Sequence, residues 1–153
     1  SAGPFVMRVH ELPGSIVPPH THPMDENITV VQGTWYFAVG EIFDTTRLQA
    51  MPAGTYAFVP AGTSMFGMSR DGAIVQVHGT GPFPIQWRYG VVTLDDSAAS
   101  RVFHYRRGDT VVGPLGPGIV REGYASGSLV QYEIERPVGG RYMAFADRVR
   151  LRH

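Results

Sequence analysis

The sequence contains no cysteine and no lysine, and each absence excludes a class of chemistry. Without cysteine, the chain has no disulfide bonds, no thiolate nucleophile and no cysteine-based zinc site. Without lysine, it cannot form a Schiff base on a lysine side chain. All 13 basic residues are arginine, so any recognition of an anion has to use arginine or backbone amides.

Long apolar runs are also absent. No segment is apolar over the length that a membrane-spanning helix needs, and the N-terminus shows no charged-then-apolar leader. We therefore expect no membrane partner and favour a cytoplasmic location, with export as the alternative if a leader was removed before Ser1.

Glycine and proline are frequent, with 19 and 12 copies in 153 residues. Both are poor in helix interiors, so they indicate many turns and few long helices. Short runs rich in β-branched and aromatic residues lie between these turn signals. We predict an all-β protein with strands at 5–9, 27–32, 35–39, 55–59, 73–78, 88–93, 101–105, 110–112, 119–121, 129–135 and 141–145.

Charge divides the chain into two parts. Residues 1–100 carry four arginines against eight acidic residues, a net charge of −4, and residues 101–153 carry nine against five, a net charge of +4. Residues 95–100 between them are small and polar, which is typical of a linker. A single helical turn capped by Asp95 or Asp96 is the alternative. We predict two domains, 1–94 and 101–153.

Three potential metal ligands follow Gly14 closely. His20, His22 and Glu26 stand at even offsets, so on one β-strand their side chains would point to the same side. Two imidazoles and one carboxylate form a three-ligand set for a divalent transition metal. Prolines at 18, 19 and 23 would stiffen the chain around them.

The same spacing resembles the first signature of the cupin superfamily. That signature is a glycine, five residues, His-x-His, three residues, a glutamate, six residues and a glycine, which are matched by Gly14, His20, His22, Glu26 and Gly33. The second signature is a glycine, five residues, Pro-x-Gly, two residues and a histidine, which are matched by Gly54, Pro60 and Gly62, with Met65 in the place of the histidine.

The resemblance covers roughly residues 5–94, and the segment from Pro18 to Asn27 is similar to small bacterial cupins. It implies a cupin-type double-stranded β-helix, or jelly-roll barrel, that forms a homodimer. In that family the last histidine of the second signature is a fourth metal ligand, so Met65 is a departure from the pattern.

Met65 limits the metal site. A thioether is a soft, weak ligand that suits Cu(I) better than harder divalent ions, so we expect His20, His22 and Glu26 to bind alone. Fe(II) is the favoured metal, with Mn, Ni and Zn as alternatives, and three ligands leave about three positions of an octahedral ion open. The competing interpretation is a barrel that no longer uses a metal.

Other residues are candidates for the interior of the barrel. His78 follows an apolar run and is predicted to face the barrel mouth as a general base or replacement ligand; a hydrogen-bonded histidine on the rim is the alternative. The predicted pocket consists of Met65, Gln76, Trp35, Phe37 and Phe58.

These features predict a metal-binding cupin that acts on a small oxygenated organic molecule by dioxygenase-like or isomerase/cyclase-like chemistry. The alternative is a metal-independent module that binds a small molecule without catalysis. Because cupins include both enzymes and binding proteins, the sequence leaves open whether this chain is an enzyme.

The basic second part carries a weaker resemblance. Its glycine-rich segment at 108–120 resembles the opening of a small SH3-like or KOW-like β-domain, and a β-rich extension of the barrel is the alternative. Arginines interleaved with aromatic residues are compatible with nucleic-acid binding. However, the excess of basic residues is only four, and Glu133 and Glu135 would spoil a basic strand, so we do not favour nucleic acid as a partner.

Overall fold

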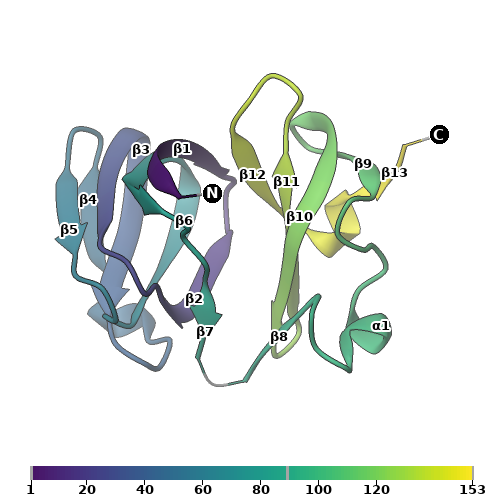
Figure 1. Ribbon diagram of the computed structural model, residues 1–153, viewed down its shortest axis with the longest axis horizontal. Helices are drawn as coiled ribbons and strands as arrows, with labels where there is room; N and C mark the ends of the chain where they lie inside the picture. Colours follow the sequence, from purple (N-terminus) through teal and green to yellow (C-terminus); the bar gives the residue numbers. More distant parts are fainter. Residues whose placement is uncertain (1, 89, 153) are drawn as a thin grey trace. The chain divides into compact units, whose positions relative to one another are not determined.

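The structure, a computed structural model, describes residues 2–88 and 90–152, and most of its regular structure is β-strand (Figure 1). The all-β prediction is therefore confirmed. The chain divides into two compact units, Ser1–Tyr89 and Gly90–His153, and each has a core of its own. We describe the two units separately.

The first unit contains a 3₁₀ turn and seven strands among its described residues. These elements are β1 (Gly3–Glu11), β2 (Ile16–Thr21), β3 (Glu26–Val39), η1 (Thr45–Arg47), β4 (Gln49–Pro52), β5 (Tyr56–Val59), β6 (Met65–Gly81) and β7 (Gln86–Trp87).

The long strands β3 and β6 are antiparallel partners within one continuous hydrogen-bonded sheet, and each has different neighbours along its two halves, so we describe the two halves as two sheets. In one sheet, β5 pairs with the first half of β3, and β1 pairs with the second half of β6. In the other sheet, β4 pairs with the second half of β3, β2 pairs with the first half of β6, and β7 pairs with β2. Two antiparallel sheets joined by shared strands make a jelly-roll arrangement.

Glycine allows the bends that join the two sheets. The strands predicted at 27–32 and 35–39 are one strand, β3, whose register shifts on both sides of Gly33. Gly33 has a φ of +73°, and a Cβ atom there would lie 2.3 Å from the Gly72 carbonyl oxygen. A Cβ on Gly67 would lie 2.3 Å from the Trp35 ring, so this glycine makes room for a core indole. Neither position tolerates a side chain without a backbone shift.

The core of the first unit lies between the two sheets. Buried residues alternate along the shared strands, as at Ile28 and Val30 on β3 and at Val75 and Val77 on β6. Trp35, Met51, Val59, Met65 and Ala73 complete the cluster. Full burial of one such aliphatic side chain contributes about 1.5–3 kcal/mol. The even-numbered positions at the start of β3 therefore face the interior, and Glu26 is among them.

The second unit is also rich in strands. Its elements are β8 (Val91–Thr93), α1 (Ala99–Val102), β9 (Thr110–Gly113), β10 (Gly116–Ser126), β11 (Leu129–Glu135), β12 (Arg141–Phe145), η2 (Ala146–Arg148) and β13 (Arg150–Leu151). The strand β10 pairs with β8, β9 and β11, while β12 pairs with β11 and β13 pairs with β9.

Three buried tyrosines dominate the core of this unit. Tyr124, Tyr132 and Tyr142 are at most 1% exposed. The Tyr132 hydroxyl oxygen accepts hydrogen bonds from the backbone N–H groups of His104, at 2.9 Å, and Tyr105, at 3.3 Å. The tyrosine thereby anchors the segment before β9 to the sheet. The SH3-like or KOW-like resemblance of this unit stays a prediction.

The structure corrects the sequence prediction near the junction. The strand predicted at 101–105 is wrong, because residues 99–102 form the short helix α1. Its N-cap is Ala98 and not Asp95 or Asp96, whose carboxylates bind the Arg107 guanidinium and the Thr93 N–H. Strand β8, predicted as the end of the first domain, pairs with β10 and so belongs to the second unit.

Among residues 2–88 and 90–152, no helix has both the length and the apolar character needed to cross a membrane.

Candidate metal centre

Two strands and the turn between them supply the three candidate ligands. His20 lies on β2, His22 directly follows the end of that strand, and Glu26 begins β3. The expectation that all three lie along one strand is therefore wrong. The chain turns at residues 23–25, where Pro23 has no N–H group to continue a β-ladder.

The loop with the Pro-x-Gly of the second cupin signature, residues 60–62, holds this turn in place. The Gly62 N–H donates a hydrogen bond of 2.8 Å to the His22 carbonyl oxygen. The neighbouring Ala61 N–H donates one of 2.8 Å to the Asp25 carboxylate. The backbone on either side of the turn is thus fixed by residues far away in the sequence.

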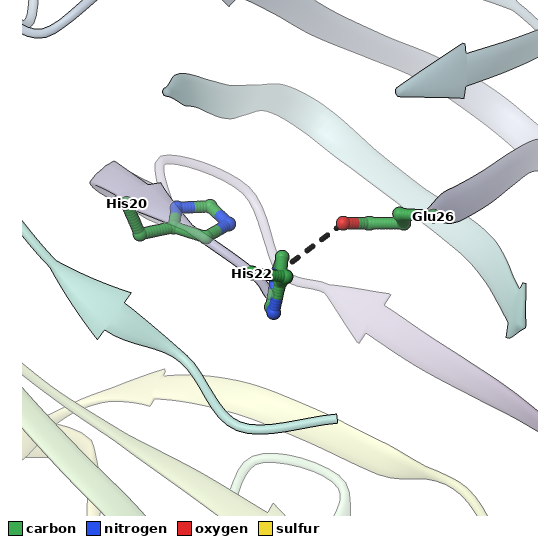
Figure 2. A group of neighbouring side chains, drawn as sticks. All are labelled: His20, His22 and Glu26. Atoms are coloured by element: carbon green, nitrogen blue, oxygen red, sulfur yellow. Dashed lines mark ion pairs between the residues drawn. The ribbon is translucent and has the colours of Figure 1, made fainter. Parts of the chain in front are cut away.

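The three side chains point toward one another and are buried (Figure 2). His20, His22 and Glu26 are 5–6% exposed, and one ligand atom from each lies within 4.8 Å of the other two. The His22 Nε2 atom is 3.3 Å from Glu26 Oε2. A single metal ion can be reached by all three groups if small side-chain movements close the remaining distance.

Backbone carbonyls decide which ring nitrogens are available. His20 Nδ1 lies 2.8 Å from the Pro18 carbonyl oxygen, and His22 Nδ1 lies 2.9 Å from the Pro84 carbonyl oxygen. A carbonyl oxygen can only accept, so both Nδ1 atoms carry the proton, and each neutral imidazole keeps a lone pair on Nε2. Histidines that bind metals are oriented in this way.

Burial also sets the charge of the site. It raises the pKa of Glu26 to about 8 and, with the proximity of His22, lowers the pKa of His20 to about 4. Burial likewise lowers the pKa of His22. Without a metal, the site at neutral pH therefore holds two neutral imidazoles and a carboxyl group that is mostly protonated.

The site fits a divalent cation. Within the described part of the chain, the buried Glu26 Oε2 atom has no hydrogen-bond partner. A buried carboxylate oxygen without a partner is costly, and a cation between it and the two Nε2 lone pairs would remove that cost. The donor set of two imidazoles and one carboxylate suits a transition metal.

Met65 lies beside the triad. It is directly opposite His20 in the pairing of β2 with β6, so both side chains leave the sheet on the same face. Met65 is 2% exposed and belongs to the core cluster of the first unit. The position that is a histidine in the second cupin signature therefore adjoins the site, and it presents an apolar side chain there.

The structure does not bring His78 and Gln76 to the triad. Val75 and Val77 face the core, so the alternation of β6 turns Gln76 and His78 to the opposite face. Gln76 accepts a hydrogen bond from exposed Arg8 on that face. His78 therefore does not share a face with the core residues of β6, which does not support its predicted role at the barrel mouth as a general base or replacement ligand.

The predicted pocket residues divide in a similar way. Trp35 and Met65 lie in the core cluster, and Phe37 is partly buried against it. Phe58 is 53% exposed, because it alternates with buried Val59 on β5. Phe58 and Gln76 are therefore not part of the interior.

Sequence reasoning missed the segment that covers the two histidines. The Phe83 ring stacks on the His22 ring at 3.9 Å between centroids with an interplanar angle of 15°. The Trp87 ring packs against His20 at 5.4 Å and 57°. The carbonyl of Pro84 comes from the same segment. The Pro84 contact is made by the backbone, and the ring contacts depend on how the distant chain folds back, so no local residue pattern could have revealed them.

Neither a protein-family model nor a curated protein sequence matches this chain. Solved structures do match. The DMSP lyase DddQ from Ruegeria pomeroyi DSS-3 is 20% identical. The match covers 58% of this chain and 45% of that chain, with a TM-score of 0.50. The polyketide cyclase RemF from Streptomyces resistomycificus is 18% identical, with 56% and 61% covered and a TM-score of 0.49.

A third similar structure is a protein with a double-stranded β-helix domain from Klebsiella pneumoniae subsp. pneumoniae MGH 78578. It is 22% identical, with 57% of this chain and 78% of that chain covered and a TM-score of 0.46. The matches span less than two thirds of the lyase and cyclase chains. At these identities the likeness to the lyase concerns the fold alone, and the fold class is all-β, as predicted.

Proposed function

We propose that the first unit is a metal-dependent cupin that binds one divalent transition metal through His20 Nε2, His22 Nε2 and Glu26. One observation carries the proposal: both Nδ1 atoms are hydrogen-bonded to backbone carbonyls, and the buried Glu26 Oε2 atom, which has no hydrogen-bond partner among the described residues, lies 3.3 Å from His22 Nε2. An ordinary packed histidine would not need this arrangement.

The side chains have distinct tasks in this proposal. His20 and His22 each direct the lone pair of a neutral Nε2 atom toward the ion, since their Nδ1 atoms are hydrogen-bonded to backbone carbonyls. Glu26 loses its proton when the cation binds and then offsets part of the cation's charge. Met65, opposite His20 in the pairing of β2 with β6, presents an apolar side chain beside the ligands and supplies no fourth strong ligand.

We further propose that the bound molecule is small and oxygenated, and that it is converted rather than only held. When bound, the metal supplies open coordination positions and polarises substrate oxygen atoms. Fe(II) is the favoured ion, with Mn, Ni and Zn as alternatives, and the reaction is of the dioxygenase or the isomerase/cyclase type. The similar lyase and cyclase are enzymes by name, which supports this choice. His78 has no part in it, because it lies on the other face of β6.

Metal content tests the proposal. The purified protein, loaded in turn with Fe(II), Mn(II), Ni(II) or Zn(II) and desalted, should retain about one ion per chain by elemental analysis. His20→Ala and Glu26→Ala should retain much less, whereas the matched histidine variant His78→Ala should behave as the wild type. Equal and near-zero metal in all four proteins would leave the metal-free binding module as the better description.

A further inference from the structure

We infer that Phe83 is a positioning residue for the metal centre: its ring fixes the plane of the His22 imidazole so that Nε2 points at Glu26. The inference rests on the proposed metal site and adds a residue to it that lies outside both cupin signatures. It concerns orientation, since Phe83 has no atom that can bind a metal.

His22 needs an external support more than His20 does. The carbonyl that binds His20 Nδ1 belongs to Pro18, two residues earlier on the same strand. The carbonyl that binds His22 Nδ1 belongs to Pro84, which is 62 residues away. His22 also lies just beyond the end of β2. Its ring direction is therefore set by the segment that begins at Phe83.

Phe83 and Pro84 restrain different motions of that ring. The hydrogen bond to Pro84 fixes the tautomer and one point of the ring, but it leaves the ring free to tilt about the Nδ1···O line. Phe83 stacks on the face of the ring at 3.9 Å and 15°, and such contact opposes tilting. The two restraints together define where Nε2 points, which neither does alone.

Phe83 is itself held from both sides. Its ring packs against the Phe5 ring of β1 at 5.0 Å, and both phenylalanines pack against the core cluster. After Phe83, the segment is fastened to β2: Trp87 pairs with His20, and the Arg88 N–H donates a 2.9 Å hydrogen bond to the Pro19 carbonyl. The support is thus rigid enough to orient a ligand.

The test is Zn(II) affinity measured on the full chain, with Phe83→Leu and Phe83→Tyr compared with the wild type. Leucine keeps an apolar side chain but removes the flat ring, and we expect Zn(II) to bind on the order of tenfold more weakly, the size of effect seen when outer-shell partners of metal ligands are lost. Tyrosine keeps the ring and should restore most of the affinity. Phe5→Leu is the matched control, because Phe5 packs against the same core cluster and against the Phe83 ring, so this variant loosens the surroundings of Phe83 and keeps the ring that stacks on His22.

A second measurement separates orientation from loosened packing. In NMR spectra of the metal-free protein at one fixed pH, the His22 ring resonances should be sharp in the wild type and in Phe5→Leu and broadened by ring motion in Phe83→Leu, while the Nδ1–H tautomer set by the Pro84 carbonyl is kept in all three proteins. If Phe83→Leu does not fold, Phe83→Met offers a flexible apolar side chain of similar size for both measurements.

The outcomes are distinguishable. If the wild type binds no Zn(II), the proposed metal site fails. If the wild type binds Zn(II) but Phe83→Leu or Phe83→Met binds it equally well and its His22 ring resonances are as sharp as those of the wild type, the inference about Phe83 is overturned. It is also overturned if Phe5→Leu weakens binding as much as the Phe83 variants do.

Discussion

Replacing Glu26 with glutamine should stabilise the metal-free protein, and increasingly so as the pH rises. Burial raises the pKa of Glu26 from its ordinary 4.5 to about 8. Between these values the folded protein holds a proton that the unfolded chain has released. The free energy of unfolding of the wild type therefore falls as the pH rises from 4.5 to about 8. Glutamine cannot ionise and escapes this loss.

The size of the effect follows from the shift. At about 1.4 kcal/mol per pKa unit, the whole shift costs about 5 kcal/mol above pH 8. About 2.5 kcal/mol of this cost develops between pH 5 and pH 7. For a chain of this length, that corresponds to about 5–10 °C in Tm. The lowered pKa values of His20 and His22 act in the opposite direction, since stability is lost as the pH falls through them, but they act in both proteins and cancel in the difference.

Urea unfolding of both proteins in the presence of a chelator, at pH 5, 6 and 7, measures this difference directly. Glu41→Gln is the control, because Glu41 is half exposed in a surface ion pair with Arg88, and such pairs contribute at most about 1 kcal/mol. With saturating Zn(II), the order should reverse, since only the wild type gains the binding energy of the metal. A stability difference that does not change with pH, or a glutamine variant that is less stable throughout, would refute the assignment of Glu26 as a buried carboxyl group with a raised pKa.

Three further predictions follow from the described contacts. Met65→His should tighten Zn(II) binding, because position 65 lies opposite His20 and the variant adds an imidazole to the site; an unchanged Kd by calorimetry would show that residue 65 does not reach the ion. In the wild type, Zn(II) affinity should rise about tenfold per pH unit up to pH 8 and then level off, because binding displaces the Glu26 proton below that pH; a flat profile of Kd from pH 6 to 8 would contradict the raised pKa. In the second unit, Tyr132→Phe should lower the free energy of unfolding by about 1–3 kcal/mol, because two backbone N–H groups lose their acceptor. Denaturant unfolding measures this change, and Tyr56→Phe at an exposed position is the control. An equal effect of both variants would contradict the prediction.

Local residue patterns predicted the strands and the ligand set well. Residues 129–135 and 141–145 form strands with the predicted bounds, because their buried residues follow from a simple β pattern. His20, His22 and Glu26 converge as their spacing predicted, although a turn and not a single strand brings them together. The prediction succeeded because spacing limits which side chains can meet, whatever the exact path of the backbone.

The errors have both local and distant causes. At His78, alternation along β6 decides the outcome: Val75 and Val77 face the core, so His78 lies on the other face. The segment at 101–105 has strand-like residues, yet α1 forms there. The roles of Phe83 and Pro84 depend on a fold-back of the chain over 62 residues, which spacing within a motif cannot show.

The most direct test of the metal centre is anomalous scattering from crystals grown with Zn(II) and measured on both sides of the zinc absorption edge. The account predicts one anomalous peak per chain, about 2.0–2.2 Å from His20 Nε2, His22 Nε2 and a Glu26 carboxylate oxygen. A map in which these three side chains are ordered but no peak lies between them would contradict the account.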